Sequence, residues 1–361
     1  MVERETEPGV FEAVEGPVRS YRRVVTLTPR PDGRVQVSTS TEFRLAVPYV
    51  GWLFLLPVRA VLRRPPRPPG SPQPWWAPPE RLDARGASVL GVLAAAALVS
   101  GYLGTLVTQT MTFAADDFGN VSDRDQSVAL AALRPGVLLA LVLLSVADRR
   151  GRRRVLVLSA GGGCILAATG ALAPSLAWLT ASQLVARVAS TLLVDLIVVF
   201  AAEEMPKGSR AYAVSVLGMA AAVGAGVCVM ALPLADLGPS GWRVLYVLPL
   251  LALPLCRGIA RLLPESRRFL VRHRRVPLAG HWGRLALLAG SGFLLALFAT
   301  PASQLQNEFL RDERGYSALA IALFTLSTNT PGGIGVVVGG HLADVRGRRR
   351  VAAVIVSWLA G

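Results

Sequence analysis

The chain has 361 residues, of which 52% are hydrophobic and only 17% are charged, and its mean hydropathy is +0.48. This composition excludes an ordinary soluble globular protein and predicts an all-α polytopic membrane protein. The net charge of +15 does not indicate nucleic-acid binding, because most basic residues lie at the ends of apolar segments and no basic stretch is interleaved with aromatic residues.

A small N-terminal α+β extension is predicted at 1–62, which we expect to be cytoplasmic. Polar and apolar residues alternate in 21–28 and 34–43, and these segments flank Pro31-Asp32-Gly33, a combination typical of a β-hairpin and its turn. The apolar run 45–62 contains two prolines and a charge. We therefore expect it to lie on the inner membrane surface, or to pack on the hairpin, and not to span the membrane.

A linker is predicted at 63–85. Eight of the 17 residues in 63–79 are proline, which favours an extended, semi-rigid spacer. Recognition of this segment as a proline-rich ligand is a second, weaker interpretation.

Membrane-spanning segments account for most of the remaining chain. A helix needs about 20 apolar residues to cross the hydrocarbon core. Eight such runs occur, at 87–111, 127–147, 155–173, 177–202, 211–232, 244–263, 285–306 and 316–340. A ninth run begins at Val351, and we expect the chain to stop inside that helix.

The connections between these runs predict an orientation. The alternate loops that follow the second, fourth, sixth and eighth runs hold 19 Lys and Arg residues, and the opposite loops hold four. The positive-inside rule then places the N-terminus in the cytoplasm. All basic residues except Lys207 are arginine, which favours a GC-rich bacterial source and therefore the bacterial inner membrane.

A repeated loop is the strongest motif. The second run is followed by Asp148-Arg149-Arg150-Gly151-Arg152-Arg153, and the eighth by Asp344-Val345-Arg346-Gly347-Arg348-Arg349, 196 residues later. Two matching loops six helices apart indicate two six-helix halves related by duplication. A carboxylate beside several guanidinium groups can hold a cytoplasmic contact between the halves that breaks when they rock. The alternative is that these arginines only follow the positive-inside rule.

The repeated loop resembles the signature of the major facilitator superfamily, Gly-x-x-x-Asp-x-x-Gly-Arg-Arg. The second copy matches fully and begins at Gly340, whereas Leu144 replaces the leading glycine of the first copy. The resemblance implies a twelve-helix fold. The first six-helix repeat would occupy 86–263, a central cytoplasmic loop 264–284, and the start of the second repeat 285–361.

Two further loops are similar to those of sugar porters and related metabolite symporters. They are Glu203 to Arg210, with the pattern Glu-x-x-Pro-x-x-x-Arg, and Pro264-Glu265-Ser266-Arg267-Arg268. The resemblance implies that acids of these loops pair with the signature arginines, so the implied gate residues are Glu203, Arg210, Glu265 and Arg268. The seventh run lacks the glutamine-rich pattern of that branch, which speaks against a hexose substrate.

Charges inside the apolar runs are candidates for solute or proton binding, because they are costly in hydrocarbon. Arg134, Arg187 and Asp195 are the three clear cases, and Arg187 matches an arginine that the family often carries. Asp195 is the natural proton carrier, although a fixed ion pair with Arg134, or with a residue on a helix missing from this chain, is the alternative. The three charges sum to +1, which favours an anionic solute.

Uncharged polar residues could complete a central site, or could only form hydrogen bonds between helices. They are Tyr102, Thr105, Gln109, Gln304, Asn307 and Asn329. Pro135-Gly136 and Pro331-Gly332-Gly333 allow bends. The spacing of the three cysteines predicts neither a metal site nor a redox pair, and we expect no cofactor and no enzymatic activity.

The sequence therefore predicts a secondary active transporter that moves a small organic solute by alternating access with protons, and that is a monomer when complete. The alternative is a truncated, non-transporting membrane scaffold that displays the N-terminal extension.

Overall fold

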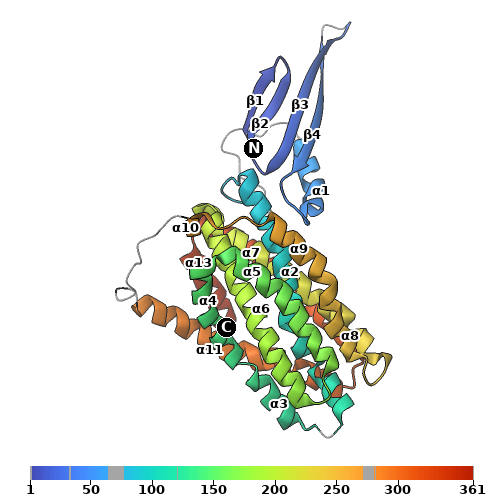
Figure 1. Cartoon of the computed structure of the whole chain (residues 1–361). Coiled ribbons are helices and arrows are strands. Elements are labelled where there is room, and N and C mark those ends of the chain that lie inside the picture. The colour runs from blue at the N-terminus through green and yellow to red at the C-terminus, as the bar shows by residue number, and fades with distance from the viewer. Residues whose placement is uncertain are drawn as a thin grey trace.

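The structure is a computed structural model of the chain, and it describes residues 2–31, 34–63, 77–119, 121–270, 280 and 282–360. Within these residues, seven helices are long and apolar enough to cross a membrane. They form a bundle, and the N-terminal strands project from one end of it (Figure 1). The prediction of an all-α membrane protein with a small α+β extension is confirmed.

The N-terminal extension contains one antiparallel sheet in the order β1-β2-β3-β4. Its strands are β1 (Val2–Glu7), β2 (Val10–Glu15), β3 (Val18–Pro29) and β4 (Val35–Leu45). The predicted hairpin corresponds to β3 and β4, although residues 32 and 33 of its turn lie outside the described residues. Four of the six residues of β1 are charged, and the apolar residues of β2 occur in pairs and do not alternate with polar ones, so neither sequence has the alternation that predicts a strand. These two strands are consequently missing from the prediction.

The segment after the sheet connects it to the bundle. Ala46 is buried, and the following Tyr49 adopts a left-handed backbone conformation with φ of 62°. Gly91 of the first bundle helix has no room for a β-carbon beside Pro48, and Gly258 has none beside the hydroxyl of Tyr49. These two glycines therefore allow the connecting turn to lie directly against the bundle.

The helix α1 (Gly51–Leu62) follows this turn and contains Pro57. It buries none of its residues, and Trp52 and Leu56 are 68% and 75% exposed. An apolar cavity separates α1 from the first bundle helix. The run 45–62 thus contains a helix of 12 residues, which is shorter than the seven helices that are long enough to cross a membrane. Residues 64–76 of the predicted linker lie outside the described residues.

The first repeat forms the six predicted spans. Its α-helices are α2 (Ala84–Phe118), α3 (Asp123–Ala132), α4 (Pro135–Arg150), α5 (Arg152–Ala168), α6 (Leu176–Glu204), α7 (Arg210–Ala231), α8 (Trp242–Val247) and α9 (Leu253–Leu262). Short 3₁₀ turns extend several of them, at η1 (Thr169–Leu172), η2 (Lys207–Ser209), η3 (Leu232–Leu237) and η4 (Leu248–Ala252). The second span breaks between α3 and α4, because Pro135 begins a new helix there.

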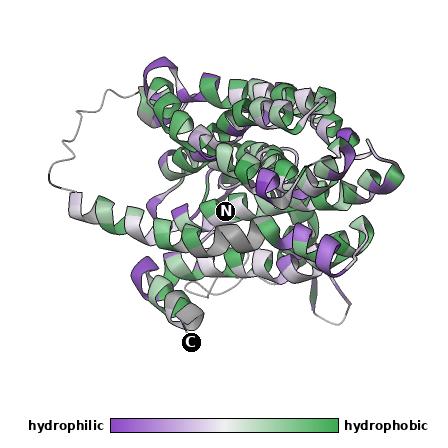
Figure 2. Ribbon diagram, turned by 90° about the horizontal axis from the view of Figure 1, so that it is seen from below, coloured by the Kyte–Doolittle hydropathy of each residue, from purple (hydrophilic) through white to green (hydrophobic). Residues whose placement is uncertain are grey.

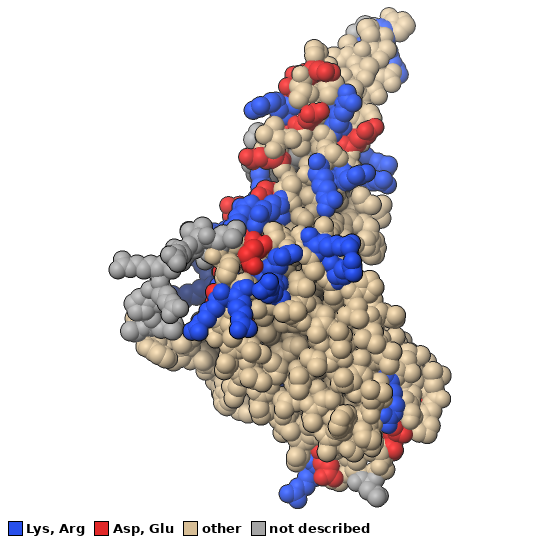
Figure 3. Space-filling view, in the orientation of Figure 1, with Lys and Arg blue, Asp and Glu red and all other residues tan. Residues whose placement is uncertain are grey.

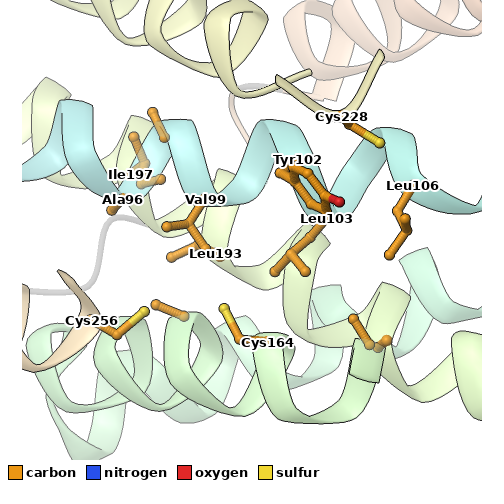
Figure 4. Packing of buried hydrophobic residues seen from close by; sticks show 14 of the residues in the cluster. Ala96, Val99, Tyr102, Leu103, Leu106, Cys164, Leu193, Ile197, Cys228 and Cys256 are labelled. Carbon is orange, nitrogen blue, oxygen red and sulfur yellow. The ribbon is translucent and has the colours of Figure 1, made fainter. Parts of the chain in front are cut away.

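The core of this repeat is built from small and aromatic residues around α2. Trp242, Tyr246 and Phe200 are fully buried, and runs of alanine in α2 let neighbouring helices approach closely. Cys164 and Cys256 are also buried, and Figure 4 shows their sulfur atoms facing one another. Hydrophobic residues line most of the length of the bundle helices in Figure 2, as expected where lipid is the solvent.

The second part of the chain contains one short helix within the central loop and the helices that follow the loop. They are α10 (Arg267–Leu270), α11 (Trp282–Glu308), the π-helical turn η6 (Phe309–Glu313), α12 (Ala318–Arg346) and α13 (Arg348–Ala360). The predicted runs 285–306 and 316–340 fall in α11 and α12, and the ninth run falls in α13. The helix α12 packs along α7, which is the main contact between the two repeats. Residues 271–279 and 281 of the central loop lie outside the described residues.

Candidate gate and solute site

The first signature loop joins α4 to α5 at the end of the bundle that carries the sheet. We call this the signature end and define it by residues 148–153 and 344–349. Arg152 pairs with Asp148 at 2.8 Å and contacts Glu203 at the end of α6. The backbone N–H of Arg153 donates to Glu265 at 3.1 Å. Both implied gate acids, Glu203 and Glu265, therefore contact the first signature loop.

A further acid, Glu204, extends this cluster. Glu204 has a side chain that is 1% exposed, and it pairs with Arg85 at the start of α2 at 3.3 Å. It also accepts a 2.6 Å hydrogen bond from the backbone N–H of Arg267, whose guanidinium lies 3.3 Å from Asp83. Glu204, Arg85 and Asp83 were missing from the predicted gate residues. Of the two adjacent glutamates at the end of α6, the resemblance implies only Glu203, and it implies no residue of the segment before α2.

The second signature loop contacts the other repeat. Asp344 has a side chain that is 1% exposed and accepts a 2.8 Å hydrogen bond from the backbone N–H of Tyr212, near the start of α7. It also pairs with Arg348 at 3.1 Å. A β-carbon on Gly340 would overlap the hydroxyl of Ser215, so α12 and α7 touch at this glycine. A buried carboxylate at a helix N-terminus is favourably placed, because the helix dipole is positive there.

The two copies of the signature therefore differ in their contacts. The carboxylate of Asp148 is 58% exposed, and its described partner, Arg152, belongs to the same repeat. Asp344 instead joins the two repeats. The contact between halves that was expected at Asp148 is not found among its described contacts, and Asp344 of the second copy makes such a contact instead.

The remaining signature and gate residues have simpler roles or lie outside the description. Gly151 and Gly347 have φ of 101° and 95°, which only glycine adopts without strain, and they turn the chain into α5 and α13. Arg210 bonds the backbone oxygen of Met205 at 3.3 Å and pairs with no described carboxylate. Arg149 and Arg349 are exposed. The side chain of Arg268 lies outside the described residues.

Two of the polar residues predicted for the central site form a hydrogen bond between the two repeats. Asn307 of α11 donates to the side-chain oxygen of Gln109 in α2 at 2.8 Å, and both residues are buried. The hydroxyl of Tyr102 donates to the backbone oxygen of Leu245 within the first repeat, which is an ordinary interhelical bond. Asn329 is exposed and Thr105 is half-buried. The side chain of Gln304 lies outside the described residues.

The two intramembrane arginines meet at one cavity. Arg134 lies at the break between α3 and α4, and Arg187 lies on α6; the cavity between them is also lined by Thr108 and Gln183. Arg187 donates a 2.9 Å hydrogen bond to the backbone oxygen of Gly104. No ion pair is found for either arginine among the described residues.

Asp195 lies two turns from Arg187 on α6 and is half-buried. The fixed ion pair with Arg134, considered from the sequence, is not found among the contacts of the described residues. The neighbouring Val194 and Val198 are 44% and 41% exposed, so this side of α6 is not closed by protein.

A second cluster of charges lies at the opposite end of the bundle. Arg311 in η6 pairs with Asp116 at the end of α2 at 2.9 Å and lies 3.8 Å from Asp236 in η3. Its guanidinium also stacks 4.2 Å from the ring centre of Phe113. Asp236 in turn accepts a 3.1 Å hydrogen bond from the backbone N–H of Ala318, the first residue of α12.

The contacts of Arg311 join the two repeats, and sequence reasoning missed them. Its partner Asp116 lies 195 positions away, and no sequence pattern marks the pairing. No group of three or more potential metal ligands is found among the described residues.

Comparisons with known proteins find a family and several solved structures, including the following two. The family model of the Major Facilitator Superfamily matches residues 93–361. The proton:xylose symporter XylE bound to 6-bromo-6-deoxy-D-glucose matches with a TM-score of 0.45 and 19% identity over 50% of this chain and 45% of that chain. A double-tryptophan mutant of XylE matches with the same values. The match thus spans less than half the length of these proteins. A search of curated proteins finds no match.

Proposed function

The chain belongs to the major facilitator superfamily and is a multi-pass membrane protein, and on that premise we propose that it is a secondary active transporter of a small organic solute. The observation that carries the proposal is the inter-repeat contact of the second signature loop. Asp344 reaches across to the start of α7, at the position where the repeats must separate if the signature end is to open. We expect no enzymatic activity and no cofactor.

Contacts between the repeats at both ends support alternating access. Asp344 and Tyr212 join them at the signature end, and Arg311 and Asp116 join them at the opposite end. To open one end of the bundle, the contacts at that end must break while the contacts at the opposite end stay in place. Packed interfaces of this kind have discrete arrangements, which is what a two-state transporter requires.

The first signature loop supports a different step of the same motion. Its contacts to Glu203 and Glu265 stay within the first repeat and tie α4, α5, α6 and the segment after α9 together. A repeat stiffened in this way moves as one body, so rocking is concentrated at the interface between repeats. We assign Glu203, Glu265, Arg152 and Arg153 to this stiffening role.

Proton coupling is assigned to Asp195. A half-buried carboxylate without a described partner changes its hydration when the surrounding helices move, and hydration controls how readily it holds a proton. Its position on α6 also places it in the same span as Arg187. Movement of the solute and the proton would then be linked through one helix.

We place the protein in a bacterial inner membrane, as a monomer when complete, with the signature end in the cytoplasm. Lys and Arg side chains gather near the junction of sheet and bundle in Figure 3, and few are visible toward the opposite end. This asymmetry supports the orientation, because positively charged segments are retained on the cytoplasmic side. The N-terminal sheet would then be cytoplasmic.

The test is solute flux in proteoliposomes, with a panel of organic acids, sugars and amines and a pH-sensitive dye inside the vesicles. We expect saturable flux of at least one solute together with proton movement. Asp195→Asn should abolish proton-coupled uptake and preserve solute exchange, whereas Asp195→Glu should retain coupling. An unchanged pH dependence in Asp195→Asn would remove this residue from the mechanism. Absence of any solute or proton flux would favour a non-transporting scaffold that displays the N-terminal extension.

A further inference from the structure

The cavity at Arg134 and Arg187 lies near the middle of the membrane. Each arginine is eleven residues from the first residue of its span, Asp123 or Leu176. At a rise of about 1.5 Å per residue, this is a depth of about 16 Å, roughly half of the hydrocarbon thickness. Arg134 and Arg187 therefore line one cavity at this depth, together with residues of α2, α3 and α6.

The charge of this cavity is not balanced by described protein groups. Arg187 is half-buried and bonds only the neutral backbone oxygen of Gly104, and Arg134 is exposed. The one described intramembrane acid, Asp195, is two turns along α6, about 12 Å from Arg187 at a rise of about 1.5 Å per residue. Two neighbouring cations at this depth are costly to hold without a counter-charge, because both are removed from bulk water. An anion in the cavity would lower that cost.

The shape of the cavity restricts the anion. Its volume is about 20 Å³, which is the room of about one water-sized group. Guanidinium groups bind planar carboxylates through paired N–H donors, and the hydroxyl of Thr108 at the wall can add a third donor. A planar carboxylate can insert one oxygen into such a space more readily than a tetrahedral phosphate with four oxygens can.

We infer that this cavity binds the carboxylate group of the transported solute, so that the substrate class is organic carboxylates. The inference rests on the proposed transport function, and it names the head group that Arg134, Arg187 and Thr108 would hold. The rest of the solute lies outside the cavity, because the cavity has room for about one water-sized group.

The experiment is calorimetric titration of the purified chain in lipid nanodiscs with benzoate and with succinate, at constant ionic strength. Benzamide and succinamide serve as uncharged isosteres, and inorganic phosphate as the tetrahedral anion. We expect binding of at least one carboxylate and at least tenfold weaker binding of its amide and of phosphate. Arg134→Gln and Arg187→Gln should each weaken carboxylate binding at least tenfold. The matched control Arg124→Gln changes an exposed arginine near the start of α3 and should leave it unchanged.

The outcomes separate this inference from the transport proposal. Equal binding of carboxylates and their amides, or wild-type carboxylate affinity in both arginine variants, would overturn the carboxylate site even if flux of another solute is measured. Carboxylate binding without flux would support the site and count against transport. If an arginine variant fails to fold, Thr108→Val tests the same cavity, because Thr108 also lines it. We expect this variant to weaken carboxylate binding about threefold to tenfold, equivalent to about 0.6–1.4 kcal/mol. Unchanged binding in Thr108→Val would remove that residue from the site.

Discussion

The side-chain amide of Asn307 donates a 2.8 Å hydrogen bond to the side-chain oxygen of Gln109, although the two residues lie 198 positions apart. Both are buried, and the bond joins α11 of the second repeat to α2 of the first. A buried amide without a partner would have no water to bond. The hydrogen bond between Asn307 and Gln109 therefore favours the association of α11 with α2.

This bond predicts measurable coupling between the two residues. Asn307→Ala and Gln109→Ala should each lower the free energy of unfolding, and the double variant should lose less than the sum. Hydrogen bonds between membrane helices give coupling energies of about 0.6 kcal/mol on average and about 1.7 kcal/mol at most. Denaturation by sodium dodecyl sulfate in mixed micelles measures the cycle. Strictly additive losses would show that the two side chains do not interact.

The gate at the signature end predicts different effects for the two copies of the signature. Asp344→Asn weakens the bond to the backbone of Tyr212 and removes the charge that Arg348 pairs with, whereas Asp148→Asn leaves the interface between repeats intact. A hydrogen bond to a charged group contributes about 1.5–3 kcal/mol. We therefore expect Asp344→Asn to increase opening about tenfold or more.

The reporter for this opening is a cysteine in place of Ser215, which lies against Gly340. Its alkylation by a water-soluble maleimide should be faster in Asp344→Asn and unchanged in Asp148→Asn. The native cysteines are buried and give a low background. Equal acceleration by both substitutions would contradict the assignment of the gate to the second copy.

The sequence was sufficient to predict the membrane spans and the position of the signature loops. A span has a length fixed by the bilayer, and a repeated loop is visible without structure. The contact of Glu203 with Arg152 was also expected, although only through resemblance. The break at Arg134 could be anticipated from Pro135, whose missing N–H interrupts the helix.

Contacts between distant residues could not be predicted in this way. The meeting of Arg134 and Arg187 depends on how α4 and α6 rotate about their axes, which hydropathy does not specify. In the sequence, nothing distinguishes Arg311 from any other polar residue at a helix end. Its partners Asp116 and Asp236 lie in two other elements, α2 and η3. The strands β1 and β2 are stabilised by pairing, and by bonds such as that from Tyr21 to Glu3, more than by an apolar face.

The gate at the opposite end predicts that Arg311→Gln opens that end. The substitution removes two partly exposed ion pairs and a cation–π contact, which together contribute about 1–2 kcal/mol. Spin labels at Leu237 and Glu313, both exposed, should show a longer and broader distance distribution in the variant. The matched control is Arg314→Gln, since Arg314 is exposed and contacts the ring of Phe309. A distribution identical to the wild type in Arg311→Gln would refute this gate.

The N-terminal sheet predicts a loss of stability at high pH. Burial, together with the hydrogen bond to Glu3, raises the pKa of Tyr21 from its usual value of 10 to about 12. A tyrosine in the unfolded chain ionises near its usual value, so the folded sheet holds a proton that the unfolded chain releases. The stabilisation is fully present below pH 10 and decreases as the pH rises toward 12. Tyrosinate absorbance of the full chain should include a step near pH 12 that is smaller in Tyr21→Phe, and the difference between the two titrations gives the contribution of Tyr21. Loss of β-sheet circular dichroism should follow over the same range, and Tyr21→Phe should lose less sheet signal between pH 10 and 12. A step near pH 12 of equal size in both proteins would exclude this account of the sheet.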